Sequence, residues 1–112
     1  MKQPMEKALY VAEENLKQIR TVAEWGKEMG YESPKKFSRK FRNHFGKRPK
    51  STLIELKLNC FFKLIEDFRE ISCYEIAVEL GLKDEIALNK FINRHTGRSP
   101  NQWKNMQVKN GN

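Results

Sequence analysis

Basic and phenylalanine side chains alternate between residues 30 and 49, GYESPKKFSRKFRNHFGKRP, which holds seven Lys or Arg and three Phe. On a helix, the three phenylalanines form one narrow stripe at i, i+4 and i+8: Phe37, Phe41 and Phe45. The opposite face gathers Lys35, Ser38, Arg39 and Arg42. The stripe predicts a buried face, and the cationic face would donate hydrogen bonds to an acidic partner. A simple solvated surface is the alternative.

The positive charge of the chain is concentrated around this stretch. The 112 residues carry a formal net charge of +8, and residues 21–50, with nine basic and three acidic side chains, contribute +6 of it. Such asymmetry is typical of an electrostatic footprint and not of a uniformly basic surface. The length allows one compact unit or two very small lobes that share an element.

Several classes of protein are disfavoured by the composition. No apolar run approaches the length of a membrane helix, and the N-terminus lacks a signal-peptide pattern, so a cytoplasmic protein is expected. Cys60 and Cys73 are expected to be buried thiols; with His44 and His95 they lack zinc-site spacing. No nucleophile and base at motif spacing and no phosphate-binding glycine loop occur. We therefore expect no catalytic residues, no metal and no cofactor.

The chain matches itself at an offset of 51 residues without a gap. The pairs include Thr21 and Ser72, Glu24 and Glu75, Gly30 and Gly81, His44 and His95, Gly46 and Gly97, and Pro49 and Pro100. These are mostly positions that set backbone geometry, which indicates a duplicated structural unit.

Each copy contains the signals of two short helices. Thr21-x-x-Glu24 and Ser72-x-x-Glu75 are capping boxes that begin a first helix, and a glycine nine residues after each hydroxyl ends it. Ser33 before Pro34, and Asp84 in the second copy, begin second helices that we expect to end near Phe45 and Thr96. Helix, tight turn and helix is the helix-turn-helix plan. Gly26, mid-helix where the second copy has Ala77, suggests close approach of the second helix.

The remaining segments complete an all-α fold of about seven helices. An amphipathic helix with Leu9, Ala12, Leu16 and Ile19 is expected before the first copy, and Trp103 is expected to anchor a last short helix. Between the copies, Pro49 begins a helix that runs to about Phe68, apolar over more than half of its circumference and thus buried on more than one side. The expected organisation is a first subdomain at 1–48, a linker helix at 49–69, a second subdomain at 70–106 and a polar tail at 107–112.

These motifs resemble the DNA-binding domain of AraC/XylS-type bacterial transcription regulators. The resemblance rests on FSRKFRNHFG at 37–46, IAVELGL at 76–82 and RHTGRSP at 94–100, and it covers about residues 5–106. It implies a monomeric domain that places helices 34–45 and 85–96 in successive major-groove segments of double-stranded DNA. RNA polymerase is a candidate second partner, and a sensor or receiver domain upstream of this chain is an open possibility.

Carried over by position, the resemblance gives the candidate DNA contacts. The base-facing candidates of the first unit are the four residues of the cationic face, with Arg39 and Lys35 proposed to bind guanine. Those of the second unit are Glu85, Ile86, Ala87, Asn89, Lys90 and Asn93, where apolar side chains suit a thymine methyl group. The phosphate candidates are Lys36, Lys40, Lys47, Arg48, Arg94 and Arg98.

The second unit departs most from the family pattern. Asp84 and Glu85 stand where a phosphate backbone would approach, and Leu82, Leu88 and Ile92 replace phenylalanines. Lys57 and Phe61 replace an arginine and an alanine of the linker, and Glu32 lengthens the first turn. We therefore expect unequal halves, with the first unit supplying most of the affinity. A domain that acts mainly in protein interaction or in non-specific DNA binding is the alternative.

Overall fold

The computed structural model describes residues 2–110, with side chains described as far as Met106. Seven α-helices and two short 3-10 helices make up the described chain, which contains no strand, so the expected all-α class is confirmed. The helices are α1 (Ala8–Glu14), α2 (Val22–Glu28), α3 (Pro34–Phe45), α4 (Pro49–Asp67), α5 (Cys73–Glu79), α6 (Glu85–Thr96) and α7 (Pro100–Asn110), with 3-10 turns at Met5–Lys7 and Leu16–Gln18.

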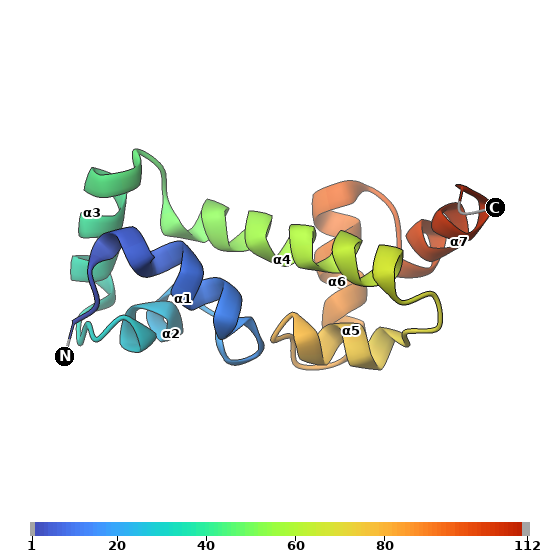
Figure 1. Cartoon of the computed structure of the whole chain (residues 1–112), viewed down its shortest axis with the longest axis horizontal. Coiled ribbons are helices and arrows are strands. Elements are labelled where there is room, and N and C mark those ends of the chain that lie inside the picture. The colour runs from blue at the N-terminus through green and yellow to red at the C-terminus, as the bar shows by residue number, and fades with distance from the viewer. Residues whose placement is uncertain (1, 111–112) are drawn as a thin grey trace. The chain divides into compact units, whose positions relative to one another are not determined.

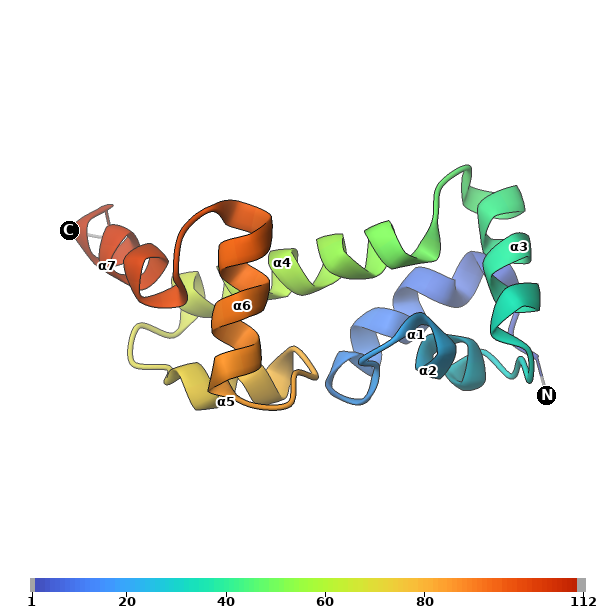
Figure 2. The same cartoon turned by 180° about the vertical axis from the view of Figure 1, so that it is seen from behind.

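The helices form two compact units, Met1–Lys57 and Leu58–Asn112, and the long helix α4 contributes residues to each. Figures 1 and 2 show the same plan twice: α3 stands steeply across α2, and α6 stands steeply across α5. The expected assignment of 49–69 to a separate linker, with subdomains at 1–48 and 70–106, remains a prediction. No helix among the described residues is both long enough and apolar enough to cross a membrane.

Both expected capping boxes are present. The Thr21 hydroxyl accepts a hydrogen bond from the Glu24 backbone N–H at 3.2 Å, while Glu24 Oε1 accepts one from the Thr21 N–H at 3.1 Å. At the second copy, Ser72 and Glu75 exchange the same pair of bonds at 3.0 Å each. Free amides at the start of α2 and of α5 are thereby satisfied, which fixes where each helix begins.

Glycines with positive φ end the duplicated helices. Gly46 (φ 74°) and Gly97 (φ 80°) close α3 and α6, each donating its N–H to a carbonyl of the last turn. A Cβ atom at either position would meet no neighbour within 4 Å, so glycine is needed there for its backbone conformation and not for space.

The core of the first unit is aromatic. Trp25, Phe37 and Phe41 are fully buried, and the Trp25 ring lies 5.5 Å and 5.0 Å from the other two ring centroids. Trp25 Nε1 donates to the Ala8 carbonyl at 3.1 Å, which ties α1 to α2. Phe45, the third residue of the expected stripe, is only half-buried because it lies at the last turn of α3.

The core of the second unit is mainly aliphatic. Phe61 and Ile65 of α4 pack with Ile76 and Leu80 of α5 and with two residues of α6, Leu88 and Ile92. Trp103 of α7 packs on its edge, with its ring 5.0 Å from that of Phe62. The anchoring role expected for Trp103 is confirmed: its Nε1 donates to Thr96 Oγ1 at 2.8 Å, which fastens α7 to the end of α6.

Lys57 is a buried cation in the first unit. Its side chain is 3% exposed, and Nζ donates to the Ile19 carbonyl at 2.8 Å. An ammonium group so far from water needs acceptors, because an unpaired buried charge is strongly destabilising. Lys57 therefore fastens α4 to the segment that precedes α2.

Four details differ from the sequence-based expectations. The N-terminal helix ends at Glu14, because Asn15 leaves the helical conformation and its amide donates to the Val11 carbonyl. Cys60 and Cys73 are half-buried instead of buried. Phe68, expected within the apolar face of α4, lies just beyond the helix and is 58% exposed. Helix α7 runs to Asn110, into the expected tail, whose side chains and last two residues lie outside the described part.

Candidate nucleic-acid interface

Helix α3 is held in place by its own buried stripe. Phe37 and Phe41 are fully buried, so the side of α3 opposite to them must face solvent. Gly26 of α2 allows the helices to come close: a Cβ atom built there would lie 3.2 Å from Phe37 Cβ. The close approach inferred from the sequence is confirmed, and it fixes the orientation of the exposed face.

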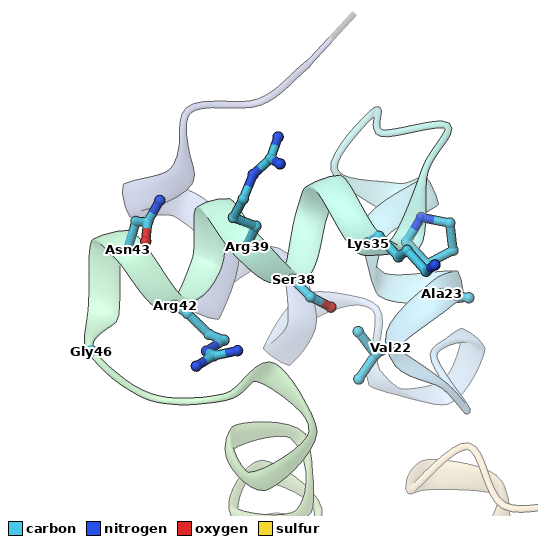
Figure 3. Close-up of a pocket in the computed structure, with 9 residues that line it drawn as sticks. Val22, Ala23, Lys35, Ser38, Arg39, Arg42, Asn43 and Gly46 are labelled. Atoms are coloured by element: carbon cyan, nitrogen blue, oxygen red, sulfur yellow. The ribbon is translucent and has the colours of Figure 1, made fainter.

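The first-unit candidates lie together on that face. Lys35, Ser38, Arg39 and Arg42 line a shallow hollow of about 750 Å³ together with Val22 and Ala23 of α2 and Pro34, Asn43 and Gly46. Figure 3 shows the two arginine side chains extending from α3 in different directions, with the Ser38 hydroxyl on the side of Val22. The guanidinium groups can therefore reach separate acceptors along a bound ligand.

The cationic groups of this face have no acidic partner among the described residues. Two ion pairs lie elsewhere in the chain: Lys47 Nζ is 3.8 Å from Glu55 Oε2, and Lys63 Nζ is 3.9 Å from Asp67 Oδ2. Lys35, Arg39 and Arg42 are exposed. The donors are consequently open to an external anion, and the positive potential is not neutralised locally.

Sequence reasoning missed Asn43, which lines the same hollow. It follows Arg39 by four residues, so helical spacing alone would have placed it on that face. Its amide can donate and accept hydrogen bonds at once, which suits a base edge. Val22 and Ala23 were missed because they belong to α2, and no spacing within α3 identifies them.

The phosphate candidates near α3 differ in their surroundings. Lys40 and Arg48 are exposed, whereas Lys47 is paired with Glu55 as described above. Lys36 lines a smaller hollow of about 270 Å³ with Lys2 and the turn before α3. An exposed pair such as Lys47–Glu55 is worth less than about 1 kcal/mol, so Lys47 can exchange its partner at small cost.

Helix α6 presents a less charged face. Ile86 is 66% exposed at the position that corresponds to Lys35, and Asn93 is exposed at the position that corresponds to Arg42. Glu85, Asn89 and Lys90 are exposed too, while Ala87 is half-buried. The structure thus places every second-unit base candidate except Ala87 on an open surface, with one cation among them.

Two amides of this face are occupied by the helix itself. Asn89 Nδ2 donates to the Glu85 carbonyl at 3.3 Å, and Asn93 Nδ2 donates to the Asn89 carbonyl at 2.9 Å. To bind a base edge through that nitrogen, each side chain has to rotate away from the backbone. Asp84, in contrast, has a structural role, since its Oδ1 accepts from the Ala87 N–H at 2.8 Å and begins α6.

Arg98 and Arg94 are not equivalent. Arg98 stacks over the Trp103 ring at 5.4 Å and donates to the Met106 sulfur, so its guanidinium is oriented by α7. Arg94 is exposed. Among the residues that the structure describes, no group of three or more His, Cys, Asp or Glu is arranged to bind a metal.

Comparison with known proteins agrees with this geometry. A family model described as a helix-turn-helix domain matches residues 33–106, about two thirds of the chain. The chain belongs to this AraC-type helix-turn-helix family. No curated protein matches the chain.

Three solved structures share the fold of this AraC-type domain. One, the DNA-binding domain of AdpA, a global transcriptional factor, in complex with a target DNA, has a TM-score of 0.79 at 24% identity and 96% coverage of both chains. A DNA-binding transcriptional dual regulator from Escherichia coli K-12 has a TM-score of 0.74 at 19% identity, and the match covers 96% of both chains. An AraC-type regulator from Chromobacterium violaceum has a TM-score of 0.71 at 18% identity, and the match covers 93% of this chain and 91% of the regulator's chain.

The positions expected to depart from the family pattern lie together in the second core. Phe61 of α4 is fully buried in the same apolar cluster as Leu88 and Ile92 of α6. All three positions are therefore filled by buried apolar side chains.

Proposed function

We propose that this chain binds double-stranded DNA in a sequence-specific manner as the DNA-binding part of a transcription regulator. Family membership and the complex of AdpA with its target DNA support the proposal. The observation that carries it is the exposed cationic face of α3, whose side chains lie together without an acidic partner in the described chain. A folded helix that presents several free donors on one face suits the major groove.

The first unit binds guanine-containing sequence in this proposal. Arg39 lies at the centre of the exposed face and offers two parallel donors, which match guanine O6 and N7. Lys35 and Asn43 flank it along the helix, while Arg42 and Lys40 contact phosphates. Each bidentate contact of this type contributes about 1–3 kcal/mol to discrimination between bases.

The second unit binds a less charged segment. Ile86 offers an apolar surface that fits a thymine methyl group, and Asn89 and Asn93 offer amides for adenine once their side chains rotate. Arg94 and Lys90 supply the phosphate contacts. Because fewer phosphates are neutralised here, most of the affinity comes from the first unit.

Four narrower expectations belong to the same proposal. The domain acts in the cytoplasm as a monomer, because an asymmetric pair of units fits an asymmetric site. RNA polymerase is retained as a candidate partner in transcription. We propose no catalytic activity, since binding alone accounts for the residues of the exposed faces.

The experiment that tests this function is selection of bound sequences from a random duplex library near ~150 mM salt, a concentration at which non-specific binding is weak. The expected result is two enriched boxes about one helical turn apart, one rich in guanine and one rich in A·T pairs. A single box would assign the second unit another role. Tight low-salt binding without enrichment would reduce the protein to a non-specific DNA binder, and absence of binding would refute the proposal.

A further inference from the structure

The second unit carries an apolar groove away from the candidate DNA-binding face of α6. Its volume is about 770 Å³, and it lies between the end of α4 and helix α5. The lining apolar residues are Leu64, Phe68, Ile71, Tyr74 and Val78. Three of them expose large fractions to solvent: 58% for Phe68, 61% for Tyr74 and 41% for Val78. Clustered exposure of large apolar side chains marks an interaction site.

The groove has an ordered geometry. Tyr74 and Val78 lie at i and i+4 on α5 and form one apolar ridge, and buried Ile71 also lines the groove. Phe68, just beyond α4, is a further lining residue, and its N–H donates to the Leu64 carbonyl at 2.9 Å. A groove lined by a helical ridge and by a ring from a second segment suits another helix, whose side chains at i, i+3 and i+4 pack against both.

The rim of the groove is acidic in an otherwise basic protein. The charged residues that line the groove are three glutamates, Glu70, Glu75 and Glu79, and one basic residue, Arg69, whereas the whole chain carries +8. Lys104, whose ammonium group donates to the Ile71 carbonyl at 2.6 Å, lies near Glu75 and offsets part of this negative charge. The local potential therefore repels a nucleic acid and attracts a cationic ligand.

From this combination we propose that the groove binds a basic amphipathic helix of a partner protein. Apolar side chains of that helix pack between Phe68 and the Tyr74–Val78 ridge, and its lysines or arginines lie along the glutamate rim. A small apolar molecule fits less well, because such ligands are mostly enclosed by their pockets, while this groove is lined by half-exposed rings. The interaction is independent of DNA binding and leaves the α6 face free.

The test is a titration of the ¹⁵N-labelled chain with a synthetic helical peptide of leucine and lysine, about 18 residues long so that it is helical on binding. The leucines are placed at i, i+3 and i+4. The expected result is a set of amide shift changes confined to residues 64–79. A second peptide with glutamate in place of every lysine keeps the same apolar face, and we expect it to bind at least about tenfold more weakly.

Two tyrosines provide matched variants. Tyr74 in the groove and Tyr10 of the first unit are exposed to similar extents, 61% and 64%. Tyr74→Ser is expected to weaken binding of the lysine peptide by about fivefold or more, while Tyr10→Ser leaves it unchanged. Thermal unfolding followed by circular dichroism verifies that both variants fold. Glu70→Lys, a change at the rim alone, is expected to weaken the lysine peptide and to strengthen the glutamate peptide.

Any of four results would overturn the proposal. Equal binding of the two peptides would remove the role of the acidic rim. Shift changes outside residues 64–79, or no binding, would remove the groove as a helix site. Self-association that is abolished by Tyr74→Ser, seen by analytical ultracentrifugation, would instead assign the groove to a second copy of this chain.

Discussion

The two units fold from the same backbone plan and fill it with different side chains. At positions 51 residues apart, Trp25 corresponds to Ile76, Phe37 to Leu88 and Phe41 to Ile92, and all six are fully buried. Gly26 likewise corresponds to Ala77. The residues that begin and end the helices have the same capping roles in both units, whereas the core residues differ in type. Helix boundaries are thus encoded by a few positions, and the cores can change as long as their volume is filled.

The exposed faces differ more than the cores. Lys35, Ser38 and Arg42 of α3 correspond to Ile86, Asn89 and Asn93 of α6, so one cation is replaced by an apolar group, the other by an amide, and the serine by a second amide. Arg39 and Lys90 are the matched cations of the two faces. This difference predicts that one unit binds DNA mainly through charge and the other mainly through shape and polar pairing.

Truncation of the core is expected to have the largest effects, and it tests the difference between the cores. Phe41→Ala removes a buried ring that lies 5.0 Å from Trp25, and we expect a loss of about 4 kcal/mol in the free energy of unfolding. The matched change Ile92→Ala removes fewer atoms and no ring contact, with an expected loss of about 3 kcal/mol. Urea denaturation measures both. An equal or larger loss in Ile92→Ala would contradict the expectation that a residue of the aromatic core contributes more to stability than its counterpart in the aliphatic core.

Exchange of the small mid-helix residues is expected to have intermediate effects. Gly26→Ala gains about 1 kcal/mol of helix propensity, but the new methyl group lies 3.2 Å from Phe37 Cβ, which the backbone of α3 holds in place. Since overpacking costs about 1–3 kcal/mol, we expect a net loss of about 1 kcal/mol. Ala77→Gly in the second unit loses about 1 kcal/mol through helix propensity and about 0.8 kcal/mol more because its methyl group is buried in the core. A Gly26→Ala variant that melts at higher temperature than the wild type would show that the helices can separate freely.

Most of the fold follows from local signals in the sequence. Ser33, Asp84 and the two capping boxes occupy their helix starts, and Gly46 and Gly97 end α3 and α6 as expected. The break at Asn15 was missed because the apolar spacing continues past it to Leu16. The exposure of Phe68 was missed because periodicity identifies apolar residues, but it does not reveal whether a neighbour covers them.

The candidate DNA-binding site is harder to predict from the sequence than the fold. The cationic face of α3 followed from helical spacing, because one helix carries all of it. The bonds of the Asn89 and Asn93 amides to the α6 backbone, and the stacking of Arg98 on Trp103, depend on side-chain conformations that spacing does not encode. The DNA contacts of all these residues remain predictions.

Removal of single methyl groups from DNA is expected to have a smaller effect, and it tests the apolar face of the second unit. If Ile86 packs on a thymine methyl group, replacing that thymine by uracil loses about 0.8 kcal/mol, or about fourfold in affinity. Uracil is introduced at each thymine of the A·T-rich box in turn, and binding is followed by fluorescence anisotropy. In Ile86→Ala the difference between thymine and uracil should vanish. A difference that persists in this variant would assign the methyl contact to another residue.

The smallest effect concerns pH and the second capping box. The pKa of Glu75 is lowered, first by the hydrogen bond from the Ser72 backbone, then by the Ser72 side chain, and also by Lys104. A carboxyl whose pKa is lower in the folded state than in the unfolded state stabilises the fold at pH values above its unfolded pKa, which is about 4.3 for glutamate. This stabilisation is lost as the pH falls through the folded-state pKa. Glu75→Gln keeps the capping geometry without the charge. Thermal unfolding should show a small deficit at pH 7 that disappears in acid; a constant deficit would contradict the charge effect.

The unequal roles of the two units are tested most directly by the matched cations Arg39 and Lys90. Affinities of Arg39→Ala and Lys90→Ala are compared on one duplex that contains both selected boxes, with circular dichroism to verify folding. We expect a loss of about tenfold to a hundredfold for Arg39→Ala, which removes a bidentate base contact, and of no more than about threefold for Lys90→Ala. A larger loss in Lys90→Ala would contradict the account, because the second unit would then supply most of the affinity.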